Sequence, residues 1–294
     1  MVKRAFLVGI LFVAIQATPA YADDASPAQI LQTLNYQKGH IEIVGSDAAI
    51  DLSPDFLYLD PKDGTTLLTK VWNNPPDAVG SIEGMIVPAG VDLTQAEGWG
   101  IVLVYENSGH VSDSDAASIN FDELLDQMKK DTNDNNDART KAGYQPIMLL
   151  GWAQPPHYDS PSKTIYWAKR MRFGNDAVDT INYFIRALGR TGVLDLNVVA
   201  SSEQLDLINA KAPQLMSMVS FKPGSQYADY QEGSDNTAAY GLAGLIAGGV
   251  LVKAGFFKGL LLMLAGFWKA IAIGAVAVFA GIGRVLKKRA GSSS

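Results

Sequence analysis

The stretch that decides the fold is TINYFIRALGRTGVLDLNVVA, residues 180–200. Apolar and β-branched residues fill Thr180–Leu188 and Gly192–Ala200, and both segments have the length of a strand. Between them lies the tight turn Gly189–Gly192, with a glycine at each end. The stretch therefore predicts two antiparallel strands joined as a hairpin.

Working outward from this hairpin, short apolar runs recur along the chain. We expect further strands at 41–44, 49–52, 56–59, 84–87, 100–105, 148–152, 164–172 and 219–222. We expect helices at 25–35, 63–71, 121–139 and 204–218. The second half of the helix at 121–139 is polar all round, so we expect it to project into solvent or to fray. Runs of strands with a few helices between them predict an α+β domain, an antiparallel sheet with flanking helices.

Charge divides the chain into three parts. All 30 acidic residues lie within residues 23–236, together with 15 of the 24 basic residues, so this stretch carries a net charge of −15. Both ends are basic and apolar. Because nucleic-acid affinity rests mainly on Lys and Arg neutralising phosphates, we expect no nucleic acid as a partner. The chain has no cysteine, which excludes disulfides, thiolate zinc sites and cysteine nucleophiles.

Residues 1–22 have the three parts of a secretory signal peptide. Lys3 and Arg4 provide the charged start, Ala5–Ile15 the apolar stretch and Ala20–Ala22 the small-x-small cleavage site. An uncleaved anchor helix is the alternative, but this apolar stretch is shorter than the roughly 20 residues that cross a bilayer. We therefore expect export and cleavage after Ala22.

The C-terminal part of the chain predicts a membrane anchor. We divide it into a linker at 223–237, an anchor of one or two apolar helices at 238–286 and a basic tail at 287–294. A single helix that crosses the bilayer and a hairpin of two helices both fit the apolar pattern. The basic residues at 284–289 favour the single crossing, because basic flanks stay cytoplasmic.

These features predict a protein of the bacterial inner membrane. We expect the acidic domain, residues 23–222, to face the periplasm and the C-terminal helices to contact the lipid bilayer. Another envelope protein is a further partner that such an anchored domain allows.

Several stretches resemble one known family. They are, in order, Val71–Pro76, Gly84–Gly90, Asp113–Leu125, Gly143–Tyr144, Gly151–Asp159, Tyr166–Lys169, Asn182–Arg190, Gly192–Asn197, Phe221–Asp229 and Ala239–Gly241. Together they resemble the bacterial family of uncharacterised membrane-anchored proteins with domain of unknown function 2167. The resemblance covers about Leu31 to Arg289 and implies an envelope protein with a membrane anchor. It implies no activity and no catalytic residues. Asn73 departs from it, because the family more often has glycine there.

Two tryptophan–proline motifs share one spacing. They are Trp72-x-x-Pro75-Pro76 and Trp152-x-x-Pro155-Pro156. Paired prolines fix an extended loop, and a tryptophan before them can form a rigid platform for stacking. With Tyr158 nearby, a sugar ring or a partner's aliphatic surface is a candidate ligand. Packing in the core is the alternative, because Trp and Tyr are largely buried on average.

His157 and Asp159 are the candidate catalytic residues. They lie in Pro-Pro-His-Tyr-Asp, where Asp159 is placed to orient His157 as a general base. The sequence supplies no Gly-x-Ser-x-Gly elbow and no cysteine as a nucleophile. Arg186 and Arg190 are candidates to bind a carboxylate, or else to pair with Asp side chains of the domain. No pattern of metal ligands is complete, so we expect no metal and no cofactor.

Two hypotheses of different class follow. The first, which we favour, is a binding or scaffold module of the envelope, with Trp72, Trp152, Pro155, Pro156, Tyr158, Arg186 and Arg190 as its binding residues. The alternative is an envelope hydrolase or glycan-acting enzyme that uses His157 and Asp159. A deep pocket with convergent ionisable groups would favour the enzyme, and a shallow aromatic groove would favour binding.

Overall fold

A computed structural model of the chain describes residues 25–248, except for 75, 96, 142–144, 176–178 and 201. The predicted signal peptide and most of the predicted anchor lie outside these residues. Among the helices within them, none is long and apolar enough to span a bilayer.

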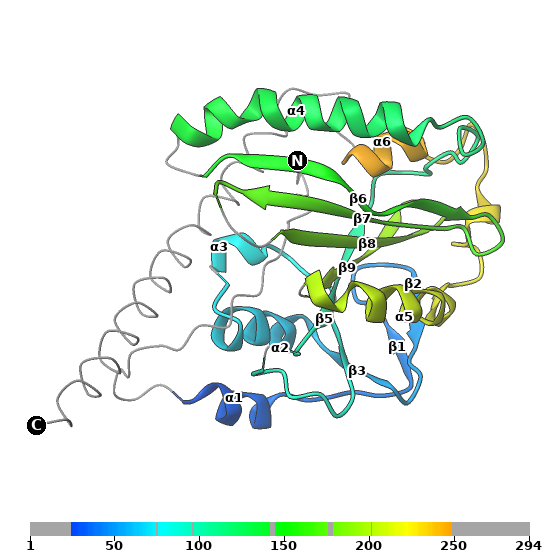
Figure 1. Cartoon of the computed structure of the whole chain (residues 1–294). Helices are drawn as coiled ribbons and strands as arrows, with labels where there is room; N and C mark the ends of the chain where they lie inside the picture. The colour runs from blue at the N-terminus through cyan, green and yellow to red at the C-terminus, as the bar shows by residue number, and fades with distance from the viewer. Residues whose placement is uncertain are drawn as a thin grey trace, which may run out of the picture.

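Seven antiparallel strands form the main sheet, in the order β3-β4-β5-β9-β8-β7-β6 (Figure 1). Their bounds are Phe56–Leu59 (β3), Gly84–Pro88 (β4), Gly100–Glu106 (β5), Ile147–Asp159 (β6), Thr164–Phe173 (β7), Thr180–Leu188 (β8) and Val193–Val199 (β9). The hairpin predicted at 180–200 is β8 and β9, paired so that Arg186 lies opposite Asp195. The predicted α+β class with an antiparallel sheet is confirmed.

A smaller sheet and one helix cover one face of the main sheet. The small sheet contains β1 (His40–Glu42), β2 (Ala48–Asp51) and β10 (Val219–Phe221), with β2 in the middle. The helix is α5 (Leu205–Met218), which buries Ile208, Ala212, Leu215 and Met218 at helical spacing. These side chains join one apolar cluster with the strands of both sheets. Burying each large aliphatic side chain contributes about 1.5–3 kcal/mol, so this cluster is a main source of stability.

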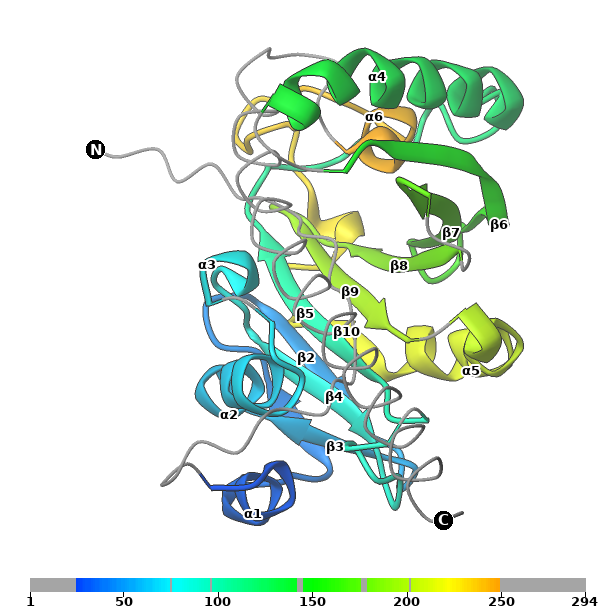
Figure 2. The ribbon, with the colours of Figure 1, turned by 60° about the vertical axis from the view of Figure 1, so that its left-hand side comes forward.

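Two groups of helices cover the opposite face of the main sheet, at opposite ends (Figure 2). The first group contains α1 (Pro27–Thr33), α2 (Pro61–Thr66) with the π-helical turn Leu67–Val71, and α3 (Pro76–Val79). The second group contains α4 (Phe121–Lys141) and α6 (Leu242–Ala247). Each group has its own apolar cluster beneath it.

Local signals set the starts of these helices. Ser26 and Gln29 form a capping box around the first turn of α1. Asp60 caps α2, which begins with Pro61. At the start of α4, the side-chain oxygen of Asn120 accepts from the amides of the first turn. These side chains satisfy amide groups that have no partner within the helix.

The second half of α4 lies against the sheet, so the expectation that it projects into solvent or frays is wrong. Asn136 exchanges two hydrogen bonds with the main chain of Ile147 in β6, each 2.8 Å long. The buried Arg139 donates to the carbonyl oxygen of Gln145 at 3.0 and 3.1 Å. Polar side chains therefore hold this half of α4 to the edge of the sheet.

Candidate functional site

The stretch Trp152–Asp159 is part of a strand and not a loop. Strand β6 forms an edge of the main sheet and continues through both Pro155 and Pro156. Its pairing with β7 shifts register three times, at Leu149/Gly151, Trp152/Gln154 and Gln154/His157. Proline has no N–H to donate, so strands accept it at sheet edges and bulges. The prediction of a loop is therefore wrong, because an edge strand tolerates the proline pair.

His157 and Asp159 do not form an acid–base pair. His157 is exposed, and its ring centroid lies 5.2 Å from that of Tyr166. Asp159 accepts hydrogen bonds from the hydroxyl and the backbone N–H of Ser162, which lower the pKa of Asp159. No hydrogen bond joins His157 to Asp159 in the described part of the chain. Asp159 therefore closes the turn between β6 and β7.

Tyr158 belongs to a cluster of polar side chains around Asp113. Its hydroxyl donates to the carboxylate of Asp113 at 2.6 Å, and the ammonium of Lys163 donates to the same carboxylate at 2.8 Å. Tyr227 accepts from the backbone N–H of Asp113. Burial by itself raises the pKa of Asp113, but the hydrogen bonds from Lys163, Tyr158 and Tyr227 lower it to about 2. Asp113 is therefore a carboxylate that ties the β6–β7 turn to a neighbouring segment.

Arg190 holds residues 223–237, the predicted linker, against the domain. Its guanidinium donates to both carboxylate oxygens of Asp235, at 2.8 and 2.9 Å, and to the carbonyl oxygen of Gly224 at 2.9 Å. A bidentate pair of this kind fixes direction as well as distance. The segment therefore packs along the domain before it reaches α6.

The ring of His110 contacts the same segment, residues 223–237. Its ring stacks on Tyr230, with centroids 3.9 Å apart, and lies 4.3 Å from the ring centroid of Tyr227. Its backbone exchanges hydrogen bonds with Asn236 and Ala238. Burial lowers the pKa of His110, so the ring is neutral at pH 7.

The two tryptophans of the shared motif both pack against the domain. Trp72 is 2 % exposed, in the apolar cluster beneath α2, and its indole N–H donates to the carbonyl oxygen of Leu93 at 2.8 Å. Trp152 is partly buried in the cluster beneath α4, and its indole N–H donates to the carbonyl oxygen of Phe121 at 3.3 Å. The geometry therefore favours packing over an open stacking platform.

Arg186 and Arg190 contact different parts of the domain. Arg186 is buried, and its Nε lies 2.9 Å from Oδ1 of Asp195. Its Nη1 donates to the carbonyl oxygen of Leu245 in α6 at 3.0 Å. Each arginine therefore pairs with an aspartate of the domain, and the two do not share one ligand.

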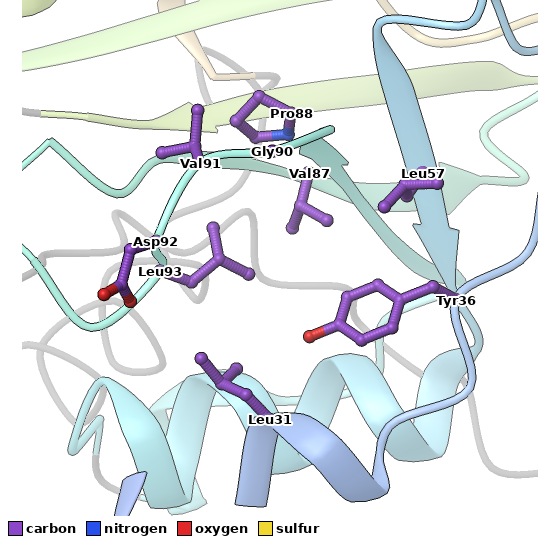
Figure 3. A pocket seen from close by; sticks show the side chains of 9 residues that line it. All are labelled: Leu31, Tyr36, Leu57, Val87, Pro88, Gly90, Val91, Asp92 and Leu93. Carbon is purple, nitrogen blue, oxygen red and sulfur yellow. The ribbon is translucent and has the colours of Figure 1, made fainter. Parts of the chain in front are cut away.

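A small apolar pocket opens between α1 and the β3 edge of the main sheet (Figure 3). Its volume is about 210 Å³. Leu31 of α1 and Leu57 of β3 contribute to its wall, and Figure 3 shows Tyr36, Val87 and Leu93 pointing into the space. The sequence patterns do not reveal this pocket, because its residues come from separate segments that the fold brings together.

The buried Trp72 supports one wall of the pocket. Its hydrogen bond to Leu93 holds the loop that contains Gly90, Val91 and Asp92, which are also part of the lining. Among the predicted binding residues, Trp72 thus contacts the pocket wall. It supports Leu93 from the apolar core and does not line the pocket itself.

The rim of the pocket is acidic. Asp92 is exposed, and hydrogen bonds from the hydroxyl and the backbone N–H of Thr94 lower its pKa. Burial raises the pKa of Tyr36, and a second carboxylate, that of Asp63, is close enough to Tyr36 to raise this pKa further. Asp63 accepts a hydrogen bond from the backbone N–H of Asn35 at 2.8 Å. Neither carboxylate forms an ion pair with any residue that the structure describes. The pocket therefore combines an apolar interior with one carboxylate in its lining, Asp92, and a second, Asp63, near Tyr36.

These features define an α+β domain with a small apolar pocket and, within the described residues, no group of three side chains suited to a metal ion. The chain belongs to the family described as "Protein of unknown function (DUF2167)", whose model matches residues 35–279. The family resemblance of the sequence motifs is therefore confirmed.

No curated protein matches the chain. Among solved structures, the chain is similar to the solution structure of cyanobacterial PsbP (CyanoP) from Synechocystis sp. PCC 6803, at 11% sequence identity and a TM-score of 0.33. That similarity covers 70% of this chain and 98% of the cyanobacterial one.

Proposed function

We propose that this chain is an envelope protein whose exported domain binds a partner polypeptide from an anchored position at the bacterial inner membrane. The location rests on the sequence. Residues 1–22 have the pattern of a signal peptide. Of the predicted anchor, α6 packs in the domain, and the sequence after it, up to residue 286, has the composition of a membrane anchor. The domain then faces the periplasm, where another envelope protein is its partner.

The pocket of Figure 3 is the observation that carries this proposal. Pockets for drug-sized ligands are typically about 300–1,000 Å³, so a cavity of about 210 Å³ suits a single apolar side chain better. Asp92 in the lining, with Asp63 close to Tyr36, favours a basic residue next to that side chain, because complementary charge fixes register and partner choice. The net charge of −15 over residues 23–236 acts in the same direction.

The alternative, a hydrolase or glycan-acting enzyme, has weaker support. A general base must lie within hydrogen-bond reach of its proton and be held in orientation. His157 is exposed on an edge strand, and Asp159 is engaged by Ser162. The pocket lining, with Asp92 and Tyr36 as its titratable residues, contains no pair of the acid–base type.

Site-specific crosslinking in the native membrane tests the proposal. A photoreactive amino acid at Leu31, in the pocket wall, is expected to form a crosslink with one defined envelope protein. The matched control is Leu207, which is 44% exposed on α5 and is not part of the pocket. No product from Leu31, or the same products from both positions, would contradict a binding role of the pocket.

A further inference from the structure

A stripe of polar residues crosses the main sheet between its two groups of helices. This polar stripe consists of Lys169 on β7, Asn182 and Arg186 on β8, and Asp195 and Asn197 on β9. Lys169 lies opposite Asn182, and Arg186 lies opposite Asp195. Because alternate residues of a strand share a face, all five lie on the face that α4 and α6 partly cover.

The polar stripe is buried although its members are polar. Four of its five residues, all except Lys169, are at most 7 % exposed. The same face carries Val102 and Val104 toward α2, and it carries Trp167 and Phe184 among the polar residues, with Phe184 between Asn182 and Arg186 on β8. Burying polar groups is costly unless they form hydrogen bonds, so packing alone does not account for the stripe.

Several atoms of the stripe lack a hydrogen-bond partner among the described residues. They are Oδ1 of Asn197, both carboxylate oxygens of Asp195 and Nε of Arg186, together with Nε1 of the neighbouring Trp167. The 2.9 Å ion pair of Arg186 and Asp195 is close but not aligned as a hydrogen bond. Arg186 and Asp195 compensate each other as an ion pair, so Asn197 and Trp167 are the buried polar groups that still need a partner in this region of the described chain.

Donors that need an acceptor predominate at the Lys169 end of the stripe. Lys169 forms no ion pair with a described residue, and its Nζ lies 5.4 Å from the ring centroid of Phe184. The amide nitrogen of Asn182 reaches only the sulfur of Met171, a weak acceptor, at 3.6 Å. Asn197 can present either its oxygen or its nitrogen, because the two ends of an amide exchange by a flip.

Two charged groups of the stripe have shifted pKa values. Burial, and then repulsion by Arg186, lower the pKa of Lys169 to about 7. Burial raises the pKa of Asp195, and its neighbour Glu106 acts in the same direction against the attraction of Arg186. A bound anion would raise the pKa of Lys169 again, because a nearby negative charge favours the ammonium form.

We propose that the polar stripe binds a small oxyanion, a carboxylate or a phosphoryl group, with Lys169 as its charged anchor. The side-chain amides of Asn182 and Asn197 and the indole N–H of Trp167 are the further hydrogen-bond donors. Lys169 keeps part of its surface accessible, which gives the anion an approach to this end of the stripe. The site shares no residue with the apolar pocket, so it is independent of the proposed function.

Thermal unfolding of the full-length protein in detergent tests this site. Acetate, inorganic phosphate and chloride are compared at equal ionic strength. A ligand that binds only the folded state raises the melting temperature. We expect a rise with acetate, with phosphate or with both, relative to chloride. A rise with acetate alone assigns a carboxylate, a rise with phosphate alone assigns a phosphoryl group, and a rise with both assigns the shared oxyanion chemistry.

Matched variants make the result specific. Lys169→Met is expected to abolish the anion-dependent rise, and Asn182→Asp is expected to do the same because it places negative charge beside the anion. Lys211→Met is the control, because Lys211 lies on α5 and pairs with Asp55 on the other side of the sheet. The proposal is overturned if neither anion stabilises the unmodified protein more than chloride does, or if Lys169→Met and Asn182→Asp retain the full rise.

Discussion

Trp72 shows at the scale of a single residue how the core shapes the surface. Its ring is buried beneath α2, and its one polar atom holds the carbonyl of Leu93 in the pocket wall. A sequence pattern predicts that a tryptophan is important but not whether it faces a ligand or supports the residues that do. The hydrogen bond to Leu93 shows that Trp72 supports the wall of the pocket.

We predict that Trp72→Phe lowers the free energy of unfolding by about 1–3 kcal/mol, because it leaves a buried carbonyl without its donor. Trp152→Phe is the matched control, since its hydrogen bond to Phe121 is longer, at 3.3 Å, and its ring is less buried. Urea denaturation measures both. Equal losses of unfolding free energy in the two variants would contradict the role of the Trp72 hydrogen bond in the pocket wall.

His110 gives a prediction about pH. Burial lowers its pKa below 6.5, with Lys163 acting in the same direction, against the opposing effects of the Arg190 backbone, Asp113 and Asp235. A histidine with a lowered folded pKa stabilises the fold above its unfolded pKa. This stability is lost as the pH falls below 6.5, because the unfolded chain takes up a proton that the folded chain resists.

We therefore predict that the contribution of His110 to the free energy of unfolding decreases as the pH falls from 7 toward 5. His110→Phe is expected to reduce this slope, because it keeps ring stacking on Tyr230 and removes the titration. The exposed His157, changed to Gln, is the control for the loss of an imidazole at the surface. Urea titrations at several pH values provide the measurement. An unchanged slope in His110→Phe would count against the assignment.

At the scale of elements, local patterns predicted the strands and helices that depend on local signals. The β8–β9 hairpin has its apolar runs and its turn in one continuous stretch, and α1 has its cap beside it. Strand β6 was predicted to end at Trp152, because a proline pair normally marks a loop; only its position at the sheet edge makes the longer strand possible. The packed second half of α4 depends on side-chain hydrogen bonds, which an apolar pattern does not record.

The candidate sites were less predictable than the elements for a related reason. Arg186 and Arg190 are four residues apart, yet their partners Asp195 and Asp235 lie at different distances along the chain. The pocket likewise depends on pairing between β3 and β4 and on the position of α1. Only the folded chain brings such residues together.

Asp115 supports a prediction about α6. Its carboxylate accepts hydrogen bonds from the backbone N–H groups of Leu242 and Ala243, at 3.1 and 3.0 Å, and so caps the helix. Removing a cap of this kind typically costs about 0.5–2 kcal/mol. We predict that Asp115→Ala loosens α6 and admits solvent to the strands beneath it.

Thiol labelling measures this effect cleanly, because the chain has no native cysteine. Val193→Cys reports on the β9 face beneath α6, and Val198→Cys reports on the opposite face. Asp115→Ala is expected to speed the labelling of Val193→Cys and not that of Val198→Cys. Equal acceleration at both positions would indicate general destabilisation instead.

At the scale of the whole molecule, the proposed function requires export of the domain and retention at the membrane. The basic residues at 284–289 predict that the C-terminus stays in the cytoplasm after a single crossing. A reporter that is active only outside the cytoplasm, attached after Ser294, is therefore expected to be inactive. Strong reporter activity would favour the hairpin geometry.

The central claim is that an acidic domain binds its partner through the pocket beside α1. Val91→Trp is expected to fill the pocket from its loop, whereas Val44→Trp adds the same side chain at a position that is 67% exposed and outside the pocket. The decisive measurement is the yield of the crosslink from Leu31 in native membranes of the two variants. Binding through the pocket predicts that Val91→Trp abolishes the crosslink and that Val44→Trp preserves it. An undiminished crosslink in Val91→Trp would contradict the claim.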